Sequence, residues 1–155
     1  MSISRTMSIV VSKNAWSKIS EILGKKTGLS KGMGGSMHLW DGSVGFYGSV
    51  PIVAGTVSLA LGAALSFKLK HLKSVAVAYI GDGAVEEGVV HESFNFAQLH
   101  NLPIVFVIEN NLFASHMHIS KRQVNNSTSR FAVANHIDNK VIDTFKINLQ
   151  LVNTK

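Results

Sequence analysis

The stretch from Gly81 to Asn111 constrains the fold of this chain more than any other. It follows the apolar, β-branched run SVAVAYI, which predicts a strand covered on both faces. Apolar residues at helical spacing come next, and then a second apolar run from Pro103 to Ile108. A strand, a helix and a second strand in this order predict two neighbouring parallel strands. We therefore expect an α/β fold built on a parallel sheet.

Polar side chains follow the ends of both predicted strands. Asp82 lies between Gly81 and Gly83, and Asn111 closes the sequence Glu-Asn-Asn. We expect Asp82 and Asn111 side by side, because open α/β sheets bind ligands just past the carboxyl ends of their strands. Mg²⁺ prefers oxygen ligands, and the chain offers the Asp82 carboxylate, the Asn111 amide oxygen and the main-chain carbonyl of Phe113. The glycines allow close approach of a ligand, and the following helix points its amino end at the same place, which suits a diphosphate.

These motifs resemble the thiamine diphosphate signature, with GDG followed at this distance by NN. More narrowly, the chain resembles the alpha subunit of the first, decarboxylating component of 2-oxo acid dehydrogenase complexes, of the pyruvate, branched-chain and acetoin type. Three segments carry the narrower resemblance: ILGKKTGLSKGMGGSMHL, GFYGSVPIVAGTVSLALGAAL and LPIVFVIENNLFASHMHISKRQ. The resemblance implies a three-layer α/β/α fold, incomplete at both ends. We assign residues 15–143 to a partial thiamine diphosphate-binding domain and leave residues 1–14 and 144–155 unassigned.

The resemblance also implies a set of cofactor-binding residues. Pro51 and Val53 match positions where family members hold the aminopyrimidine ring through main-chain groups, although Pro51 replaces a glycine and lacks an N–H. The predicted cofactor-binding set is Pro51, Val53, Gly81, Asp82, Gly83, Ala84, Asn111 and Phe113. Within it, Asp82, Asn111 and Phe113 are the predicted Mg²⁺ ligands.

Thiamine diphosphate would supply the chemistry that the resemblance implies, namely oxidative decarboxylation of a 2-oxo acid with transfer of the acyl group to a lipoyl disulfide. The implied partners are a dehydrogenase beta subunit, which provides the glutamate that activates the aminopyrimidine, and a lipoyl-bearing acyltransferase. We do not find the upstream Tyr-Arg type diphosphate clamp or the downstream histidine of the family. We therefore interpret the chain as a fragment or truncated gene product that does not turn over alone. Two alternatives stay open: a transketolase-type thiamine enzyme, and a non-catalytic remnant that binds a partner.

A glycine-rich segment, TGLSKGMGGSMHLWDGS, has no periodicity and predicts a long loop with a functional role. It follows a helical pattern from Ala15 to Leu23, which Gly24 would end in a left-handed conformation. Family members usually carry a basic residue where this chain has Met33. His38 has two interpretations, a catalytic contact with substrate or a histidine held by loop carbonyls.

The stretch from Val50 to Phe67 is the most apolar part of the chain and approaches the roughly 20 residues of a membrane span. Small residues recur within it, namely Gly55, Thr56, Ser58 and Gly62, and they favour a helix packed closely inside a large assembly. We therefore predict a packed helix that starts at Pro51 rather than a membrane span.

Four further polar residues have open interpretations. Glu86 and Glu87 either join an acidic network near the cofactor or interact with a helix dipole, and we favour the dipole. His116 and His118 would share a face if extended, but two ligands without a third make a weak metal site, so we favour an active-site loop or surface histidines. Beyond them, we expect a short helix within residues 127–136 and a strand starting at residues 141–143.

The composition fits one domain with a real core, because 155 residues contain 46% hydrophobic and only 15% charged residues. The net charge is +6, but the basic residues are scattered, which favours a solvated surface over nucleic-acid binding. The absence of cysteine excludes disulfides, cysteine-ligated zinc and thiol catalysis. The first residues make a poor signal peptide, so we expect a cytoplasmic protein, or one of the mitochondrial matrix if the source is eukaryotic.

Overall fold

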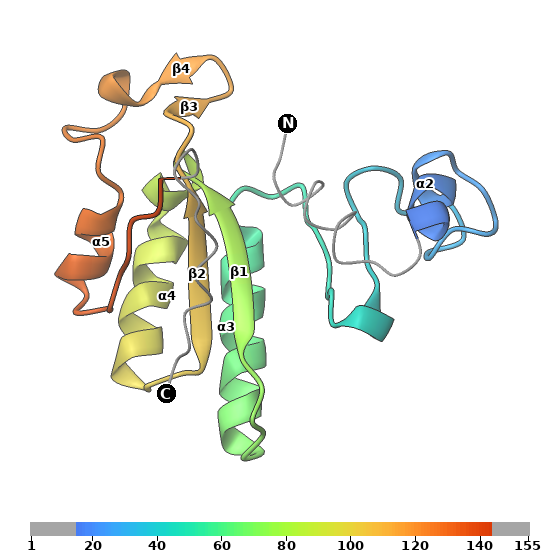
Figure 1. Cartoon of the computed structure of the whole chain (residues 1–155), viewed down its shortest axis with the longest axis horizontal. Helices are drawn as coiled ribbons and strands as arrows, with labels where there is room; N and C mark the ends of the chain where they lie inside the picture. Colours follow the sequence, from blue (N-terminus) through green and yellow to red (C-terminus); the bar gives the residue numbers. More distant parts are fainter. Residues whose placement is uncertain (1–14, 144–155) are drawn as a thin grey trace.

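The computed structural model describes residues 15–143. The predictions for residues 1–14 and 144–155, and most of the segment considered as a signal peptide, lie outside these described residues. The elements run in the order α2 (Ala15–Ile22), η1 (Gly42–Val44), α3 (Gly55–Leu69), β1 (Ala76–Gly81), η2 (Ala84–Glu86), α4 (Gly88–Leu99), β2 (Ile104–Glu109), β3 (Phe113–Ala114), β4 (Met117–His118), η3 (Ile119–Lys121) and α5 (Ser129–Ala134) (Figure 1).

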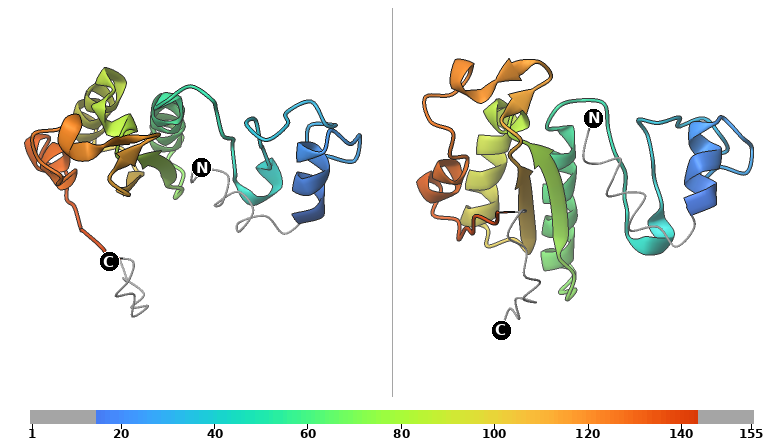
Figure 2. Two further views of the ribbon diagram at one scale, coloured as in Figure 1. Left: turned by 90° about the horizontal axis from the view of Figure 1, so that it is seen from above. Right: turned by 45° about the horizontal axis from the view of Figure 1, so that its top comes forward.

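A parallel βαβ unit forms the centre of the described chain. β1 and β2 pair in parallel from Ala76 opposite Ile104 to Gly81 opposite Glu109, and α4 connects them. α3 and α4 lie against the same face of the two strands (Figure 2). This arrangement confirms the α/β fold with a parallel sheet, present here as a partial domain.

The two faces of β1 differ in burial. Ala76, Ala78 and Ile80 are buried toward the helices, whereas Val77 on the opposite face is 46% exposed. Val105 in β2 is similarly exposed, at 48%. The prediction of a strand covered on both faces is therefore wrong within residues 15–143. β-branched residues also suit a half-buried pleated surface, so an apolar run does not reveal whether one face or both are covered.

Two clusters of buried side chains stabilise this unit. One lies near the carboxyl ends of the strands and consists of Ala54, Val57, Ile80, Val85, Val90 and Phe94. The other lies toward the opposite end and consists of Ala64, Ala76, Ala97 and Leu102. The first cluster joins α3, β1, η2 and α4, so it fixes the end of the sheet at which the predicted site residues lie.

The apolar helix starts later than predicted. α3 begins at Gly55, and the residue before it, Ala54, has a left-handed φ of 61°. Pro51 lies in a bend upstream of α3, so the prediction that it starts the helix is wrong. α3 packs against β1 and α4, as the small residues suggested. No helix within residues 15–143 is long and apolar enough to cross a membrane.

α2 forms where the helical spacing predicted it, and Gly24 after it has the expected left-handed φ of 67°. The side chains that define the spacing are nevertheless exposed: Trp16 is 77% exposed and Leu23 is 65% exposed. Lys18 and Glu21 are the buried residues of this helix. The helix therefore contacts the following loop through charged side chains rather than through its apolar stripe.

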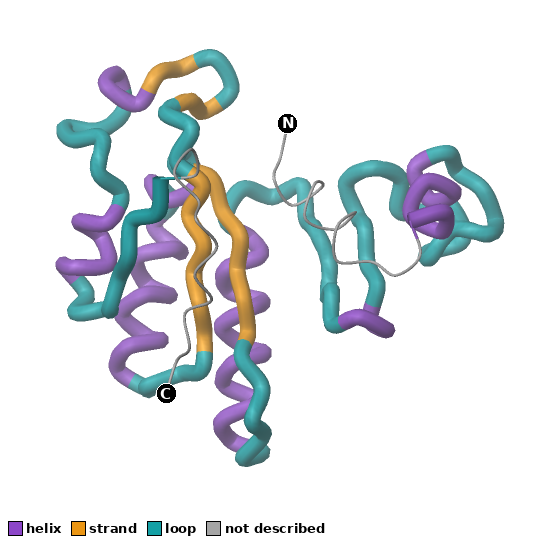
Figure 3. Tube along the Cα trace, viewed as in Figure 1, coloured by secondary structure: helices purple, strands orange, loops and turns teal. Residues whose placement is uncertain are grey.

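The carboxyl-terminal part of the described chain is mostly loop. α5 lies within the predicted range 127–136 and beside α4, which confirms the short helix (Figure 1). Residues 141–143 form no strand, so the prediction of a strand starting there is wrong for the described residues. Figure 3 shows loop along most of the connection from α2 to α3, as the glycine-rich sequence predicted.

Candidate functional site

The eight residues predicted to bind the cofactor line one hollow of about 580 Å³ at the carboxyl ends of β1 and β2. Gly81 pairs with Glu109 at the end of the sheet, and the Asp82 N–H donates to the Glu109 carbonyl at 3.2 Å. Asp82 and Asn111 therefore follow neighbouring strand ends, as predicted from their positions. The lining of the hollow includes Pro51, Val53, Gly81, Asp82, Gly83, Ala84, Asn111 and Phe113, together with Ser36, Met37 and Glu87.

Asp82 is only 1% exposed and forms an ion pair. Its Oδ2 accepts a hydrogen bond from Arg122 Nη2 at 2.6 Å. Its main-chain carbonyl accepts from Gln123 Nε2 at 3.2 Å. Sequence reasoning missed both partners, because Arg122 and Gln123 are 40 and 41 residues away along the chain and no local pattern connects them to Asp82.

Glu86 belongs to the same network. Its carboxylate accepts hydrogen bonds from Arg122 Nη1 and, at 2.7 Å, from Gln123 Nε2. α4 begins only at Gly88, after the N-cap residue Glu87, whose side chain makes no capping hydrogen bond. Glu86 lies in η2, before the N-cap of α4, and interacts with a specific cation, so its contacts favour a charged network near the hollow over the dipole of α4.

Asn111 stands at the start of a tight turn. Its Oδ1 accepts from the Phe113 N–H at 2.9 Å, and the neighbouring Asn110 accepts in the same way from Leu112. This turn leads into the β3–β4 hairpin and holds Phe113 at the rim of the hollow, where it is 51% exposed. An amide oxygen has two lone pairs, so the bond to Phe113 leaves one for a second contact.

The residues of the hollow fit a cation held by oxygen atoms. A carboxylate, an amide oxygen and a main-chain carbonyl are the donors that Mg²⁺ takes when phosphate oxygens complete its shell. Within residues 15–143, no three His, Asp or Glu side chains gather to hold a metal, so a cation here would need such additional oxygens. The lining contains no lysine or arginine, which means that a diphosphate would be neutralised chiefly by the cation and by main-chain N–H groups.

The two glycines around Asp82 have different surroundings. A Cβ added to Gly81 would meet nothing within 4 Å, so this position leaves space in the hollow. A Cβ added to Gly83 would lie 2.7 Å from the Cβ of Ala114 in the hairpin. Gly81 thus allows a ligand to approach the main chain, whereas Gly83 allows the β3–β4 hairpin to pack against η2.

A buried carboxylate organises the glycine-rich loop on the other side of the hollow. Glu21 in α2 accepts main-chain N–H bonds from Ser30 at 2.7 Å, Gly32 at 2.9 Å and Gly34 at 2.5 Å. Burial alone would raise the pKa of the Glu21 carboxyl, but these loop N–H donors outweigh it and lower the pKa below its ordinary value. The loop then reaches the hollow through Met37.

Lys18 lies one turn of α2 before Glu21 and is fully buried. Its ammonium lies 4.7 Å from the centroid of the Phe46 ring, a cation–π contact. Burial lowers the pKa of Lys18, and attraction to Asp41 acts in the opposite direction. The sequence offered no signal for these buried charges, because charged residues in a short amphipathic helix normally face solvent.

His38 is exposed and does not line the hollow, although Ser36 and Met37 just before it do. Its main-chain N–H donates to the Gly34 carbonyl at 3.1 Å. The structure therefore does not bring His38 together with the other predicted site residues, and a catalytic role for it stays a prediction.

His116 and His118 do not share a face. A turn at Ser115 and His116 separates β3 from β4, so the extended conformation assumed for the pair is absent. His118 Nδ1 lies 2.9 Å from the Ser120 hydroxyl, and its ring packs edge-on against Phe113 at 5.1 Å. These contacts favour a role in shaping the hairpin over metal binding.

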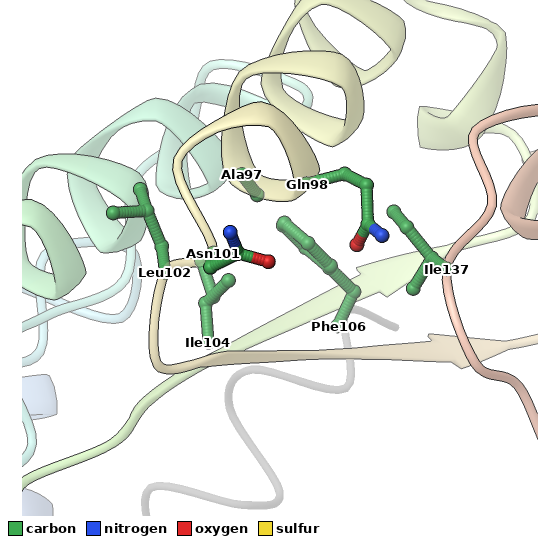
Figure 4. A pocket seen from close by; sticks show the side chains of 7 residues that line it. All are labelled: Ala97, Gln98, Asn101, Leu102, Ile104, Phe106 and Ile137. Carbon is green, nitrogen blue, oxygen red and sulfur yellow. The ribbon is translucent and has the colours of Figure 1, made fainter.

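A second, smaller hollow of about 280 Å³ lies at the opposite end of β2. Figure 4 shows its lining, which consists of Ala97, Gln98, Asn101, Leu102, Ile104, Phe106 and Ile137. None of these side chains titrates, and only two are polar. The chemical groups suited to a charged cofactor therefore lie at the other end of the sheet.

Comparisons with known proteins identify the family of the chain. The family described as Dehydrogenase E1 component matches residues 4–143. The chain is 52% identical over 93 residues to the alpha subunit of acetoin:2,6-dichlorophenolindophenol oxidoreductase of Bacillus subtilis, covering 60% of this chain and 28% of that protein. It is 43% identical over 103 residues to the pyruvate dehydrogenase E1 component subunit alpha of Rhizobium meliloti, covering 66% and 30%. The match thus spans less than a third of the length of either relative.

Proposed function

The chain belongs to the dehydrogenase E1 component family, and we propose that it is part of an alpha subunit that binds thiamine diphosphate through Mg²⁺ in the hollow at the ends of β1 and β2. The observation that carries the proposal is the convergence of Asp82, Asn111 and Phe113 on one hollow with Pro51 and Val53. These residues come from separate parts of the chain, and their donor groups suit a hard cation and a ring held by main-chain atoms.

The chain's own residues would bind and orient the cofactor. The Asp82 carboxylate, the Asn111 amide oxygen and the Phe113 carbonyl would hold the cation, and the main chain at Pro51 and Val53 would hold the aminopyrimidine ring. When bound, thiamine diphosphate supplies the chemistry that removes CO₂ from a 2-oxo acid. The buried position of Asp82 would reduce the access of water to a cation bound there.

We extend the proposal to the activity of the whole assembly. The reaction is oxidative decarboxylation of a 2-oxo acid, or cleavage of acetoin, with transfer of the acyl group to a lipoyl disulfide. The partners are a beta subunit, which completes the active site, and a lipoyl-bearing acyltransferase. The names of the relatives include both acetoin and pyruvate, so we propose the class of substrate and not one compound. A location in the cytoplasm or mitochondrial matrix stays a prediction.

Calorimetric titration of the purified chain with thiamine diphosphate, with and without Mg²⁺, tests the binding site. We expect binding that requires Mg²⁺ and that is lost in Asp82→Ala, since the carboxylate is the only charged ligand that the chain would give the cation. The matched control is Asp138→Ala, which removes an exposed carboxylate outside the hollow. Equal binding by Asp82→Ala and the control would refute the assignment.

The non-catalytic remnant is the second candidate function, because the match covers less than a third of either relative. The exposed apolar side chains of Trp16 in α2 and of Leu23 just after it would suit contact with a partner chain. A folded chain that captures a beta subunit but shows no metal-dependent cofactor binding would favour this candidate over the first.

A further inference from the structure

Arg122 joins the candidate cation site to the loop that follows it. Its Nη2 donates to Asp82 Oδ2 at 2.6 Å, and its Nη1 donates to the Glu86 carboxylate. Its Nε donates to the Met117 carbonyl at 3.3 Å. The Arg122 side chain is 7% exposed, so its charge is held almost entirely by these groups.

Gln123 strengthens the same connection. Its Nε2 donates to the Asp82 carbonyl at 3.2 Å and to Glu86 at 2.7 Å. Its Oε1 accepts from Arg130 Nη2 at 3.0 Å. Two consecutive residues of the loop, Arg122 and Gln123, therefore contact both the side chain and the main chain of Asp82, and Arg130 in α5 holds Gln123 in place.

Apolar packing joins the loop to the same end of the sheet. Ile119 is fully buried, and its N–H donates to the Leu112 carbonyl at 2.8 Å. Ala114 approaches Gly83 so closely that a methyl group at Gly83 would clash with it. The loop from Asn111 to Gln123 is thus docked on the strand end by charge and by packing together.

We infer that Arg122 is a positioning residue, which fixes the orientation of the Asp82 carboxylate at the hollow and latches the loop from Asn111 to Gln123 onto the end of β1. A free carboxylate side chain rotates, and holding one of its oxygens fixes the direction of the other. A guanidinium group suits this task because its rigid planar fork presents Nη2 to Asp82 and Nη1 to Glu86 in a fixed geometry, which the compact ammonium group of lysine lacks. The role of Asp82 as a cation ligand rests on the proposed function, whereas the latch itself does not.

The direction in which the affinity for the cation changes when Arg122 is replaced separates positioning from a simple charge effect. Removing a positive charge next to Asp82 would strengthen cation binding by electrostatics alone. Loss of positioning weakens it, because the carboxylate must then be ordered when the cation binds. Mn²⁺ is a suitable probe, since it takes similar oxygen ligands and its binding is followed by electron paramagnetic resonance.

The test uses the full chain with saturating thiamine diphosphate. We expect Arg122→Gln to weaken Mn²⁺ binding by about tenfold or more, the size expected for loss of a hydrogen bond to a charged group. Arg122→Lys should recover part of the affinity, because it restores one of the two ion pairs. The matched control, Lys121→Gln, removes a neighbouring exposed charge and should leave binding as it is. Unchanged or tighter binding in Arg122→Gln would overturn the positioning role.

Hydrogen exchange of the chain without cofactor or metal tests the latch independently. We expect the amides of residues 112–123 to exchange about tenfold faster in Arg122→Gln than in Lys121→Gln, while those of β1, β2 and α4 keep their protection. If Arg122→Gln loosens the whole chain, the exchange of the loop is measured in Glu86→Gln instead. The Glu86 side chain is 32% exposed, so the fold should tolerate this change, which removes one of the two ion pairs of Arg122. Wild-type exchange of the loop in Glu86→Gln would overturn the latch.

The two measurements keep the latch apart from the proposed function. If the wild-type chain binds no Mn²⁺ with thiamine diphosphate, the cofactor assignment fails, and the exchange of residues 112–123 still decides whether Arg122 docks the loop. If Mn²⁺ binds and the loop exchanges equally in all variants, the cofactor assignment holds and the latch fails.

Discussion

A methyl group at Gly83 should destabilise the chain, whereas the same change at Gly81 should not. The Gly83 Cβ would lie 2.7 Å from Ala114 Cβ and 3.6 Å from both Ala114 Cα and Arg122 Nη1. The Gly81 Cβ would meet no atom within 4 Å. Neither glycine has a positive φ, so alanine suits both backbone conformations. The pair therefore isolates the effect of the contact with the hairpin.

The expected magnitudes follow from two opposing effects. Replacing glycine by alanine at a compatible position stabilises by about 0.4–1 kcal/mol, because the unfolded chain loses conformational freedom. Overpacking by one methyl group costs about 1–3 kcal/mol. The difference predicts that Gly83→Ala lowers the free energy of unfolding by about 1–2 kcal/mol and that Gly81→Ala raises it by roughly 0.5 kcal/mol.

Urea unfolding of the two variants and the wild type measures these differences as shifts in the midpoint urea concentration, provided that the dependence of the unfolding free energy on urea is the same in all three. In a chain of this size, each kcal/mol corresponds to a shift of about 2–4 °C in Tm. Ala114 lies in a short hairpin, so relief of the clash should also raise hydrogen exchange of residues 113–118 in Gly83→Ala. Equal stability of the two variants would refute the close packing of the hairpin on η2.

Two further predictions concern the core and the loop. Phe94→Ala removes a side chain that is 1% exposed and should cost about 3–5 kcal/mol of unfolding free energy in urea, whereas Leu99→Ala, at a position 70% exposed, should cost less than about 0.5 kcal/mol. Glu21 has a lowered pKa in the folded chain. Its contribution to the free energy of unfolding is therefore fully present above its pKa in the unfolded chain and is lost as the pH falls through its pKa in the folded chain. The urea midpoint should therefore fall less between pH 6 and pH 3 in Glu21→Gln than in the wild type.

Local sequence patterns were sufficient to predict the central unit and the adjacency of Asp82 and Asn111, whereas Pro51 and Val53 were predicted from the family resemblance. β1 and β2 follow continuous apolar runs and α4 follows a helical spacing, and a strand, a helix and a strand in this order predict parallel pairing. Asp82 and Asn111 lie at the same edge because each directly follows a strand end. Such inferences need no knowledge of contacts between distant residues.

The contacts that hold the hollow in place were beyond sequence reasoning. Arg122 reaches Asp82 because of the path of a loop, and a loop has no periodicity from which that path could be read. In α2 the helical spacing was correct, but it did not reveal that Glu21 would be covered by loop N–H groups while Trp16 stays exposed. An apolar stripe predicts a helix without predicting what covers it.

The site and the nearby core are one physical unit, because the predicted cofactor residues are chain neighbours of buried ones. Val53 precedes Ala54, Gly81 follows Ile80, and Ala84 precedes Val85. The three neighbours all belong to the cluster that also contains Phe94. Loosening this cluster would move the hollow's lining, so cofactor affinity and stability should fall together in Phe94→Ala. Leu102 belongs to the cluster toward the opposite end of the sheet, so its truncation should lower stability and leave the affinity of the folded chain unchanged.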